Sequence, residues 1–401
     1  MSGHPHSHSH SHPPVALRRP LWTPGVLVML AFMAAAAVTL VVRFTGGIGA
    51  VSNLSNARPW GLWVAIDVAT GVALAAGGFT TAALAHIWGR HRYETVVRPA
   101  LLTAMLGYSF VVLGLLVDIG RSWAIWKPIF FQNHHSVLFE VAMCVLVYLH
   151  VLYIEFVPVV DEGLRDARPG HPLQKLVAAI NRRLRPILWI FIVAGVVLSC
   201  MHQSSLGSLM LIAPTKVHPL WYTPLLPLLF LLSAIAAGFP MVIVEATLAS
   251  SSLGTDDEME VLTPLSRFTI VLLGLYLALK VGDLLWRGSW TSLLDGTTQS
   301  NAFLAEMGLG VVLPFLMLLR AKVRRSRRTL FIAALLIVGG VVLNRINVFI
   351  VAFTPPLSTT PYSPALGEIL ITCGFVAALM FCYRLAVTWL PVLAEKKEKT
   401  P

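Results

Sequence analysis

The chain has 401 residues, of which 56% are hydrophobic and only 12% charged, with a formal net charge of +11 and a mean hydropathy of +0.76. Soluble domains carry about 25% charged residues, so this composition excludes an ordinary soluble enzyme and predicts a polytopic membrane protein. The positive charge alone would fit a nucleic-acid-binding protein. Its placement along the chain is better explained by membrane topology, so we expect no nucleic-acid partner.

Apolar runs of about 20 residues predict ten membrane-spanning helices. Their expected limits are 21–42, 60–88, 99–118, 136–160, 186–201, 223–248, 266–286, 301–319, 329–352 and 365–390. The fifth is the shortest and can extend toward Ile212. Residues 1–20, which begin MSGHPHSHSHSHPP, form a His-rich tail that we expect to be disordered and solvated, or else to bind a divalent metal weakly. Residues 391–401 form a second tail.

The Lys and Arg residues indicate the orientation of these spans. If the N-terminus is cytoplasmic, 20 of the 30 lie on the cytoplasmic side, six on the outer side and four within spans. Positive residues concentrate on the cytoplasmic side of membrane proteins. We therefore expect a multi-pass protein of a bacterial inner membrane with both termini in the cytoplasm.

The stretch DIGRSWAIWKPIFFQNHHSVLFE, residues 118–140, concentrates polar groups between two spans. It contains Asp118, Arg121 and Glu140. A carboxylate within a span costs about 2.5–3.5 kcal/mol on insertion scales, so such groups usually face a functional site in the protein interior. The alternative is an interfacial loop that anchors the membrane boundary through Trp123 and Trp126.

Depth along the helices places three carboxylates in the outer half of the membrane. At 1.5 Å per residue, Asp67 lies about 10 Å below Trp60, Glu140 lies roughly 6 Å below Ser136, and Asp118 ends the third span. Asp67, Asp118 and Glu140 could therefore surround one cavity if spans two to four pack together.

Span four also carries a line of polar residues at near-helical spacing. Glu140, Cys144, Tyr148 and Glu155 recur along one face, which would suit a proton relay. Tyr108 lies near the middle of the preceding span. The alternative is an ordinary bundle seam with Glu155 at the cytoplasmic interface.

The segment MHQSSLGSLM ends span five and contributes His202, Gln203 and Ser204. A neutral imidazole beside an amide and hydroxyls can hydrogen-bond a quinone carbonyl and supply a proton near neutral pH. The alternative is a Gly/Ser turn that caps a helix. Further along, Lys280 and Asp283 are expected to pair because they are three residues apart on span seven.

Intrinsic metal cofactors are not expected. The four cysteines, Cys144, Cys200, Cys373 and Cys382, stand singly in apolar runs without metal-ligand or disulfide spacing. A haem b group needs two histidines at matched depth, and the candidates His86 and His150 are not level. The chain is therefore expected to hold neither haem nor an iron–sulfur cluster.

Six blocks resemble a known family in order and spacing: RPWGLWVAIDV, VRPALL, DIGR, SVLFE, MHQSSLGSLM and KVHPLW. They are similar to HybB-type membrane subunits of periplasm-facing uptake [NiFe]-hydrogenases, within the NrfD/polysulfide-reductase membrane-subunit family. The resemblance covers residues 45–390, roughly, and HQSSLGSL is its most specific piece. It implies two four-helix bundles, from spans 2–5 and 6–9, with spans 1 and 10 peripheral.

The resemblance also implies a function. Such a subunit binds menaquinone or ubiquinone near the outer face and receives electrons from a ferredoxin-like iron–sulfur subunit, which is fed by the small and large hydrogenase subunits. The family's membrane carboxylates fall on Glu140 and, in VIVEATL, on Glu245, with Asp67 and His202 in matching blocks.

We thus expect three sets of site residues. Glu140 and His202 would protonate the quinone; the residues that bind it would be Asp67, Tyr108, Asp118, Arg121, Gln203 and Ser204; and a proton path would run through Tyr148, Glu155 and Glu245. Two alternatives stay open. The partner could be a molybdopterin or multihaem oxidoreductase, or the chain could be a secondary transporter that uses the same carboxylates.

Overall fold

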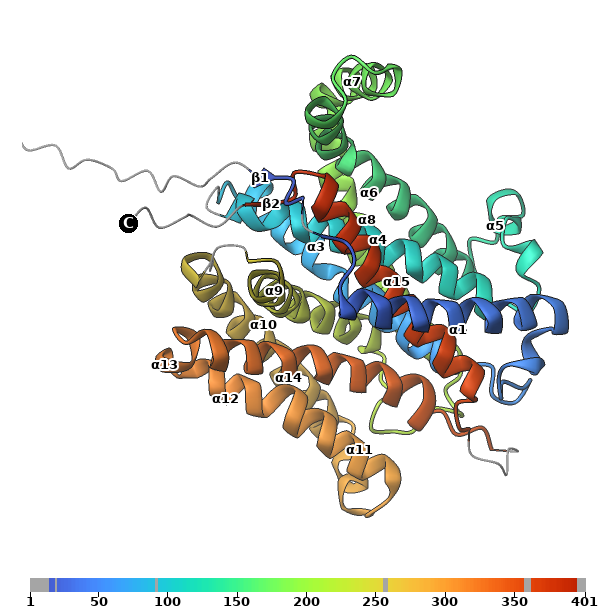
Figure 1. Ribbon diagram of the computed structural model, residues 1–401. Helices are drawn as coiled ribbons and strands as arrows, with labels where there is room; N and C mark the ends of the chain where they lie inside the picture. The colour runs from blue at the N-terminus through green and yellow to red at the C-terminus, as the bar shows by residue number, and fades with distance from the viewer. Residues whose placement is uncertain (1–13, 19, 91–92, 255–258, 357–361, 395–401) are drawn as a thin grey trace, which may run out of the picture.

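The computed structural model describes residues 14–18, 20–90, 93–254, 259–356 and 362–394. Within these residues, ten helices are long and apolar enough to cross a membrane. This confirms the all-helical, polytopic fold predicted from the sequence (Figure 1). Residues 1–13 of the expected N-terminal tail and 395–401 of the C-terminal tail lie outside the described residues.

The helices of spans two to five form the first group, in which the second span packs on the third and the fourth packs on the third and fifth. The second span is a continuous run of mixed helix type with π-helical segments at both ends, a form often seen at functional sites. The group comprises η2 (Trp63–Thr70), α2 (Gly71–Leu74), α3 (Ala76–Ala82), η3 (Ala83–Ile87), α4 (Glu94–Asp118), α6 (Val137–Ala167) and α8 (Leu188–Ser208).

The helices of spans six to nine form the second group, which packs around α9 and α14. It comprises α9 (Leu226–Leu253), α10 (Met259–Trp286), α11 (Thr298–Met307), η9 (Gly308–Val312), α12 (Leu313–Leu319), α14 (Arg327–Ile346) and η10 (Asn347–Val351). The two groups meet where α3 crosses α9. A Cβ atom on Gly77 would lie 3.1 Å from the Gly238 carbonyl oxygen, and one on Gly238 would lie 2.7 Å from Thr80 Oγ1. Glycine at both positions therefore permits this close crossing.

Helices α1 (Pro24–Gly46) and α15 (Leu366–Trp389) pack mainly on each other and, through α15, on α4 and η2. The chain ends are joined beside them. Strand β1 (Pro14–Val15) pairs antiparallel with β2 (Leu393–Ala394). Both ends of the described chain therefore lie on the same side of the helices (Figure 1), and Pro14 and Val15, expected in the tail, belong to the folded part.

The remaining elements are short connectors and one longer helix that the sequence analysis did not predict. This helix, α7 (Pro172–Leu184), follows α6, which continues to Ala167 beyond its expected limit of 160. In Figure 1, α7 projects from the bundle at the top. The connectors are η1 (Ile48–Ala50), η5 (Ser122–Ala124), α5 (Lys127–Phe130), η6 (Arg185–Ile187), η7 (Leu209–Ile212), η8 (Ser289–Leu294) and α13 (Ala321–Arg324).

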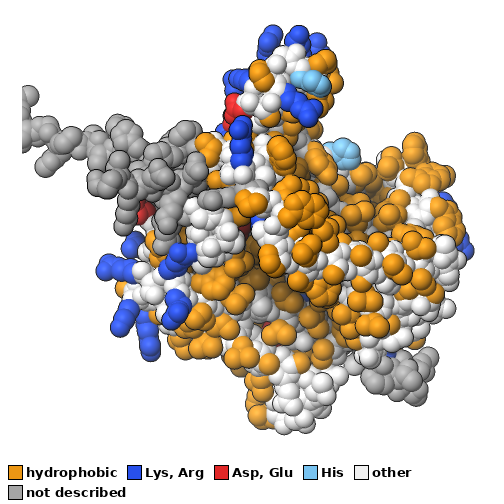
Figure 2. All heavy atoms as spheres, viewed as in Figure 1, with side chains coloured by type: hydrophobic (Ala, Val, Ile, Leu, Met, Phe, Trp, Pro, Cys, Tyr) orange, Lys and Arg blue, Asp and Glu red, His pale blue; other side chains and the backbone are white. Residues whose placement is uncertain are grey.

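The surface agrees with a membrane setting. Figure 2 shows hydrophobic side chains spread across the middle of this face, whereas Lys and Arg side chains gather around α7 and at the left of the view. Exposed basic residues include Arg182 and Arg183 of α7, Lys322 of α13, and Arg325 and Arg328 just after α13.

Candidate functional site

The first helix group has a buried polar centre formed by His202 of α8, Tyr108 of α4 and Tyr148 of α6. Each of the three is at most 1% exposed. The Tyr108 hydroxyl and His202 Nδ1 are hydrogen-bonded at 3.2 Å. The rings of Tyr108 and Tyr148 pack edge to face with their centroids 4.5 Å apart. Three residues distant in sequence thus form one contact cluster, which we call the His202 cluster.

Several polar atoms of the His202 cluster have no hydrogen-bond partner among the residues that the structure describes. They are His202 Nε2, Tyr148 Oη and the hydroxyl of Ser199, a buried α8 residue beside both tyrosines. Ser199 is near enough to interact with them but lacks hydrogen-bonding geometry. An unpaired buried polar group costs about 1–3 kcal/mol, so native proteins keep few of them. Open hydrogen-bonding positions of this kind are typical of a site that binds a ligand, water or a moving proton.

Gln203 and Ser204 continue α8 beside this cluster. Gln203 is fully buried, and its Nε2 donates to the Val72 carbonyl oxygen at 2.7 Å, while its Oε1 is buried without a partner. Ser204 is half-buried, and its hydroxyl donates to the Pro227 carbonyl oxygen at 3.4 Å. Because α8 runs to Ser208, these residues lie within a helix, and the alternative of a Gly/Ser turn is wrong.

Helix α6 carries the two predicted carboxylates, Glu140 at its start and Glu155 just past its middle. Glu140, in the first turn, is exposed. It interacts electrostatically with the buried Cys144 one turn along. Glu155 is half-buried, and its buried Oε1 has no hydrogen-bond partner in the described chain. It lines a cavity of about 10 Å³ with Tyr148, a space on the order of one water molecule.

Asp67 of η2 and Asp118, the last residue of α4, lie in a separate cluster. Thr372 of α15 donates to Asp67 Oδ2 at 2.7 Å, and Asp67 and Asp118 interact electrostatically. Arg43 of α1, only 3% exposed, donates from Nε to the Val117 carbonyl oxygen at 2.9 Å and also interacts with Asp118. The guanidinium therefore caps the carboxyl end of α4 and offsets carboxylate charge.

A third carboxylate, Glu368 of α15, completes this acidic cluster and was not expected from the sequence. It is fully buried and interacts with Asp118. Its Oε1 accepts from the Asn53 backbone nitrogen at 3.0 Å, and its Oε2 accepts from the Tyr362 hydroxyl. Burial, and then the hydrogen bond to Glu368, raise the pKa of Tyr362 above its usual range.

Of the three carboxylates expected around one cavity, Asp67 and Asp118 interact within this acidic cluster, whereas Glu140 is exposed at the start of α6. His202 is enclosed by its own cluster. One cavity shared by Asp67, Asp118 and Glu140 therefore stays a prediction. Depth along a helix fixes height in the membrane but leaves open the direction in which a side chain points.

The other two predicted residues lie apart from both clusters. Arg121, in the loop after α4, is exposed. Glu245 of α9 is half-buried and lines a mostly apolar cavity of about 340 Å³ between α1, α4, α9 and α15.

The second helix group has a buried centre of its own around Glu306 of α11, which is 1% exposed. Glu306 Oε2 accepts from Trp221 Nε1 at 3.0 Å and from Asn347 Nδ2 at 2.8 Å. Glu306 Oε1 accepts from Asn344 Nδ2 at 2.7 Å. We call this set the Glu306 network.

Two buried cations belong to the Glu306 network and interact electrostatically with its carboxylate. Arg345 is fully buried, and its guanidinium carbon lies 3.7 Å from the centroid of the Phe230 ring. Its NH2 donates to Ser233 Oγ at 2.9 Å. Lys280 is 2% exposed and lies 5.3 Å from the Phe303 ring centroid.

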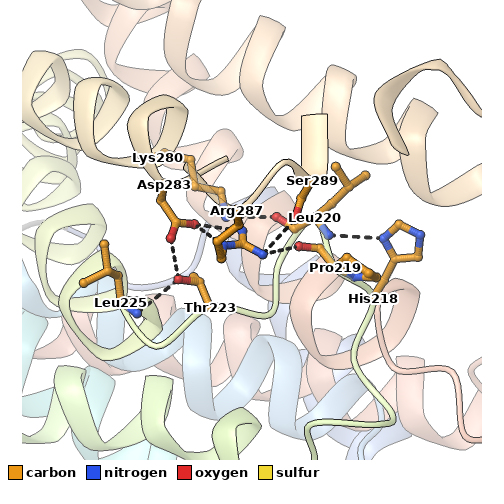
Figure 3. A network of polar contacts seen from close by, with 9 residues as sticks. All are labelled: His218, Pro219, Leu220, Thr223, Leu225, Lys280, Asp283, Arg287 and Ser289. Atoms are coloured by element: carbon orange, nitrogen blue, oxygen red, sulfur yellow. Dashed lines mark hydrogen bonds and ion pairs between the residues drawn. The ribbon is translucent and has the colours of Figure 1, made fainter. Parts of the chain in front are cut away.

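At the C-terminal end of α10 the network continues into the loop between η7 and α9 (Figure 3). Lys280 Nζ points to the Leu220 carbonyl oxygen at 3.4 Å. Asp283 instead pairs with Arg287 at 2.8 Å and accepts from Thr223 Oγ1 at 2.7 Å. Lys280 and Asp283, which were expected to pair, still interact electrostatically, but the close ion pair of Asp283 is its i,i+4 contact with Arg287.

His218 closes this loop. Its Nδ1 accepts from the Leu220 backbone nitrogen at 3.3 Å, and its own backbone nitrogen donates to the Ala352 carbonyl oxygen at 2.9 Å. Partial burial lowers the pKa of His218, and the charge of Asp295 opposes that shift.

Fold and site together define a multi-pass membrane protein with a partly unsatisfied polar centre in one helix group and an ionic centre in the other. A family model described as "Polysulphide reductase, NrfD" matches residues 50–356. The chain is 36% identical over 90% of its length, and 90% of that protein's, to the "Probable Ni/Fe-hydrogenase 2 b-type cytochrome subunit" of Escherichia coli. The chain belongs to the NrfD family.

Two further relatives come from Nitratidesulfovibrio vulgaris. One, named only as a protein, is 40% identical over 94% of this chain and 96% of its own length. The other, "Menaquinone reductase, integral membrane subunit", is 26% identical over 88% of this chain and 87% of its own length.

Proposed function

We propose that this chain is the quinone-binding membrane anchor of a periplasm-facing [NiFe]-hydrogenase, which passes electrons from a docked iron–sulfur subunit to menaquinone or ubiquinone. The similarity to a hydrogenase subunit and to a menaquinone reductase subunit supports this proposal. The observation that carries it is the unpartnered Nε2 of His202 at the buried centre of the first helix group.

The residues of the His202 cluster suit a quinone headgroup. A bound quinone accepts two electrons and two protons at its carbonyl oxygens. If the Tyr108 hydroxyl donates to His202 Nδ1, the imidazole proton lies on Nε2, because the hydrogen bond at one ring nitrogen sets the tautomer at the other. Nε2 is then a donor without an acceptor, which a carbonyl oxygen would satisfy. Gln203 and Ser204 would support this part of α8.

Glu140 would supply protons from the surface. It lies at the outer start of α6, where the Ser136 side chain caps the helix by accepting from the Phe139 backbone nitrogen at 3.4 Å. Its exposure lets it exchange protons with water. Tyr148 lies about two turns further along the same helix and contacts Tyr108, so the surface carboxylate and the His202 cluster are linked along one helix face.

The inner part of the proposed path runs through Tyr148, Glu155 and Glu245. The water-sized space beside Tyr148 and Glu155 supports the first two. Glu245, which lines the separate cavity between α1, α4, α9 and α15, would belong to another branch. Asp67, Asp118 and Arg121 remain proposed quinone-binding residues toward the outer face, on the side where the hydrogenase subunits would dock. Both termini would be cytoplasmic, because Lys and Arg concentrate on the side where β1 pairs with β2.

The name of the Escherichia coli relative includes a b-type cytochrome, but we propose that this chain holds no haem of its own. His86 and His150 are both exposed, and His150 Nδ1 is already hydrogen-bonded to the Leu146 carbonyl oxygen at 2.7 Å. A reduced-minus-oxidised spectrum of the purified chain without haem b bands is the expected result.

The functional test compares two electron acceptors. In the complex purified with its native partners, Glu140→Gln should leave assembly intact and reduce hydrogen-dependent quinone reduction by about 10²-fold or more, in the range of general acid catalysis. An artificial acceptor that takes electrons before the membrane subunit should still be reduced at the wild-type rate. Wild-type quinone turnover in the assembled variant would contradict the role of Glu140. Copurification of a molybdopterin or multihaem enzyme would change the partner, and copurification of no redox subunit would favour a transporter.

A further inference from the structure

An open cavity of about 470 Å³ lies on the side of the bundle between α4, α6, α7 and α15. Its walls include Phe156 of α6, Ile180 of α7 and Leu390 after α15. The hydroxyl of Tyr153, which also lines the cavity, is hydrogen-bonded to Ser109 Oγ at 2.9 Å. The volume lies within the roughly 300–1,000 Å³ of pockets that hold ligands. Walls of this chemistry fit a hydrocarbon chain.

The cavity lies toward the side of the bundle where the chain ends meet. Leu390 leads into β2, and the next residue, Pro391, accepts from Arg98 at 3.0 Å. Arg98 is one helical turn from the cavity residue Leu102 and pairs with Glu162 at 2.6 Å. The guanidinium of Arg98 therefore lies near the end of the cavity that is closest to the paired chain ends.

Helix α7 borders the same end and is amphipathic. Leu173, Leu176 and Ile180 recur on one face of the helix and are 50%, 58% and 42% exposed. Arg183 is exposed and lies one turn beyond Ile180. An isolated helix with exposed leucines and basic residues is typical of a helix lying in the membrane interface. Figure 2 shows the two kinds of side chain together on this projection.

Helix α7 is held in this position by a buried carboxylate. Asp161 of α6 is 1% exposed. Its Oδ2 accepts from Asn181 of α7 at 2.7 Å and from Arg165 at 2.8 Å. The cavity and the basic helix that borders it therefore form a fixed arrangement.

We propose that the cavity and α7 form a binding site for an anionic phospholipid. One acyl chain lies in the cavity, and the phosphate lies at the membrane surface beside Arg183, since Arg98 is already paired through both terminal nitrogens with Glu162. Charge complementarity selects this occupant: residues 172–187 contain Lys175, Arg182, Arg183 and Arg185 and no acidic residue. Each basic residue near a membrane surface favours anionic lipid by about 1 kcal/mol. The proposal does not depend on the quinone function.

The test uses the full chain purified in detergent and native mass spectrometry. Phosphatidylglycerol and phosphatidylcholine with the same acyl chains are added separately, and inorganic phosphate serves as a competitor without a chain. We expect at least fivefold stronger retention of phosphatidylglycerol and no displacement by phosphate. Arg183→Gln should weaken its binding by about fivefold, the factor that corresponds to one surface charge. Ala386→Phe, which places a ring at the cavity wall, should weaken the binding of both lipids.

Lys322→Gln is the matched control, because Lys322 is an exposed basic residue beside the other basic patch and away from α7. It should bind phosphatidylglycerol as the wild type does. Equal retention of the two lipids, displacement by phosphate, or unchanged binding by Arg183→Gln would each overturn the proposal. If Ala386→Phe does not fold, the Arg183→Gln result decides, since an exposed substitution changes stability by only about 0.5 kcal/mol.

Discussion

His202 and Glu306 are each buried at the centre of one helix group, but their surroundings differ. Around His202 the polar groups are phenols, hydroxyls and an amide, and several of their atoms lack a partner within the described residues. Around Glu306 the groups include Lys280 and Arg345, and both carboxylate oxygens accept hydrogen bonds. One nitrogen of the Glu306 network, Arg345 Nε, also lacks a partner within the described residues, but both oxygens of the carboxylate are bonded. A bonded carboxylate flanked by two buried cations fixes helices relative to one another, whereas unpaired neutral groups can bind a ligand, water or a moving proton.

This difference suggests a division of labour between the groups. Removing one partner from a buried ion pair leaves an uncompensated charge, which is strongly destabilising. Removing a hydroxyl from the His202 cluster leaves no such charge. Substitutions in the second group should therefore affect folding first, and substitutions in the first group should affect turnover first.

The largest effect is expected for Glu306→Ala. Lys280 and Arg345 would remain buried without their carboxylate, at a cost of about 3–5 kcal/mol, a large part of the 5–15 kcal/mol, roughly, that stabilises a typical protein. We expect little monodisperse protein when a fluorescently tagged variant is extracted in detergent and analysed by size-exclusion chromatography.

Glu306→Gln is the matched variant, because it keeps the shape of the side chain and removes only its charge. It should fall between Glu306→Ala and the wild type. If Glu306→Ala instead yields wild-type amounts of stable protein but an inactive complex, the division between the groups is wrong. The water-sized cavity of about 20 Å³ beside Glu306 and Tyr276 would then become a candidate proton site.

The second-largest effect is expected for Tyr108→Phe, which removes the hydroxyl that contacts His202. Loss of one hydrogen bond costs about 1 kcal/mol, so the protein should still fold. Hydrogen-dependent quinone reduction should fall at least tenfold, because His202 loses the bond that fixes its tautomer. The readout is the ratio of quinone reduction to reduction of an artificial acceptor in the same preparation.

Tyr276→Phe is the control from the other helix group, since Tyr276 is also buried but lies near Glu306 and Arg345. It should leave that ratio unchanged. Equal loss in both variants would show that burial of the phenol, rather than contact with His202, accounts for the effect.

The sequence was sufficient for the ten spans because each must supply a long apolar run to cross the bilayer. It also identified Tyr108, Tyr148 and His202 as candidate site residues, since polar residues are rare in such runs. It did not reveal the Glu306 network. Trp221 and Asn344 contact Glu306 from elements distant in the sequence, so the residues next to Glu306 give no indication of the network.

Two further features were missed for different reasons. Helix α7 has a helical apolar period, but it is too short and too basic to cross a membrane, so it lies between the predicted spans. Glu368 lies at the start of the last span, and only packing of α15 against α4 and η2 brings it to Asp118. Depth and period are one-dimensional signals, so they cannot indicate which helices face each other.

The smallest expected effect is a pH dependence that refines the comparison in the loop before α9, at the edge of the second group. Burial lowers the pKa of His218 below the value of about 6.5 for an unfolded histidine. As the pH falls below that value, the unfolded chain binds a proton before the folded one does, so this histidine makes the fold less stable in acid. Protonation of Nδ1 would also remove the acceptor for the Leu220 backbone nitrogen.

The variant His218→Asn tests this. Its side chain keeps an acceptor that can bond the backbone nitrogen two residues further on, but it does not titrate. Its melting temperature should therefore fall less than that of the wild type between about pH 7.5 and pH 5. His171→Asn is the matched control, because His171 makes the same contact with the Leu173 backbone nitrogen at the exposed start of α7. A variant that loses stability in acid as steeply as the wild type would show that other groups, and not His218, set the acid sensitivity of this loop.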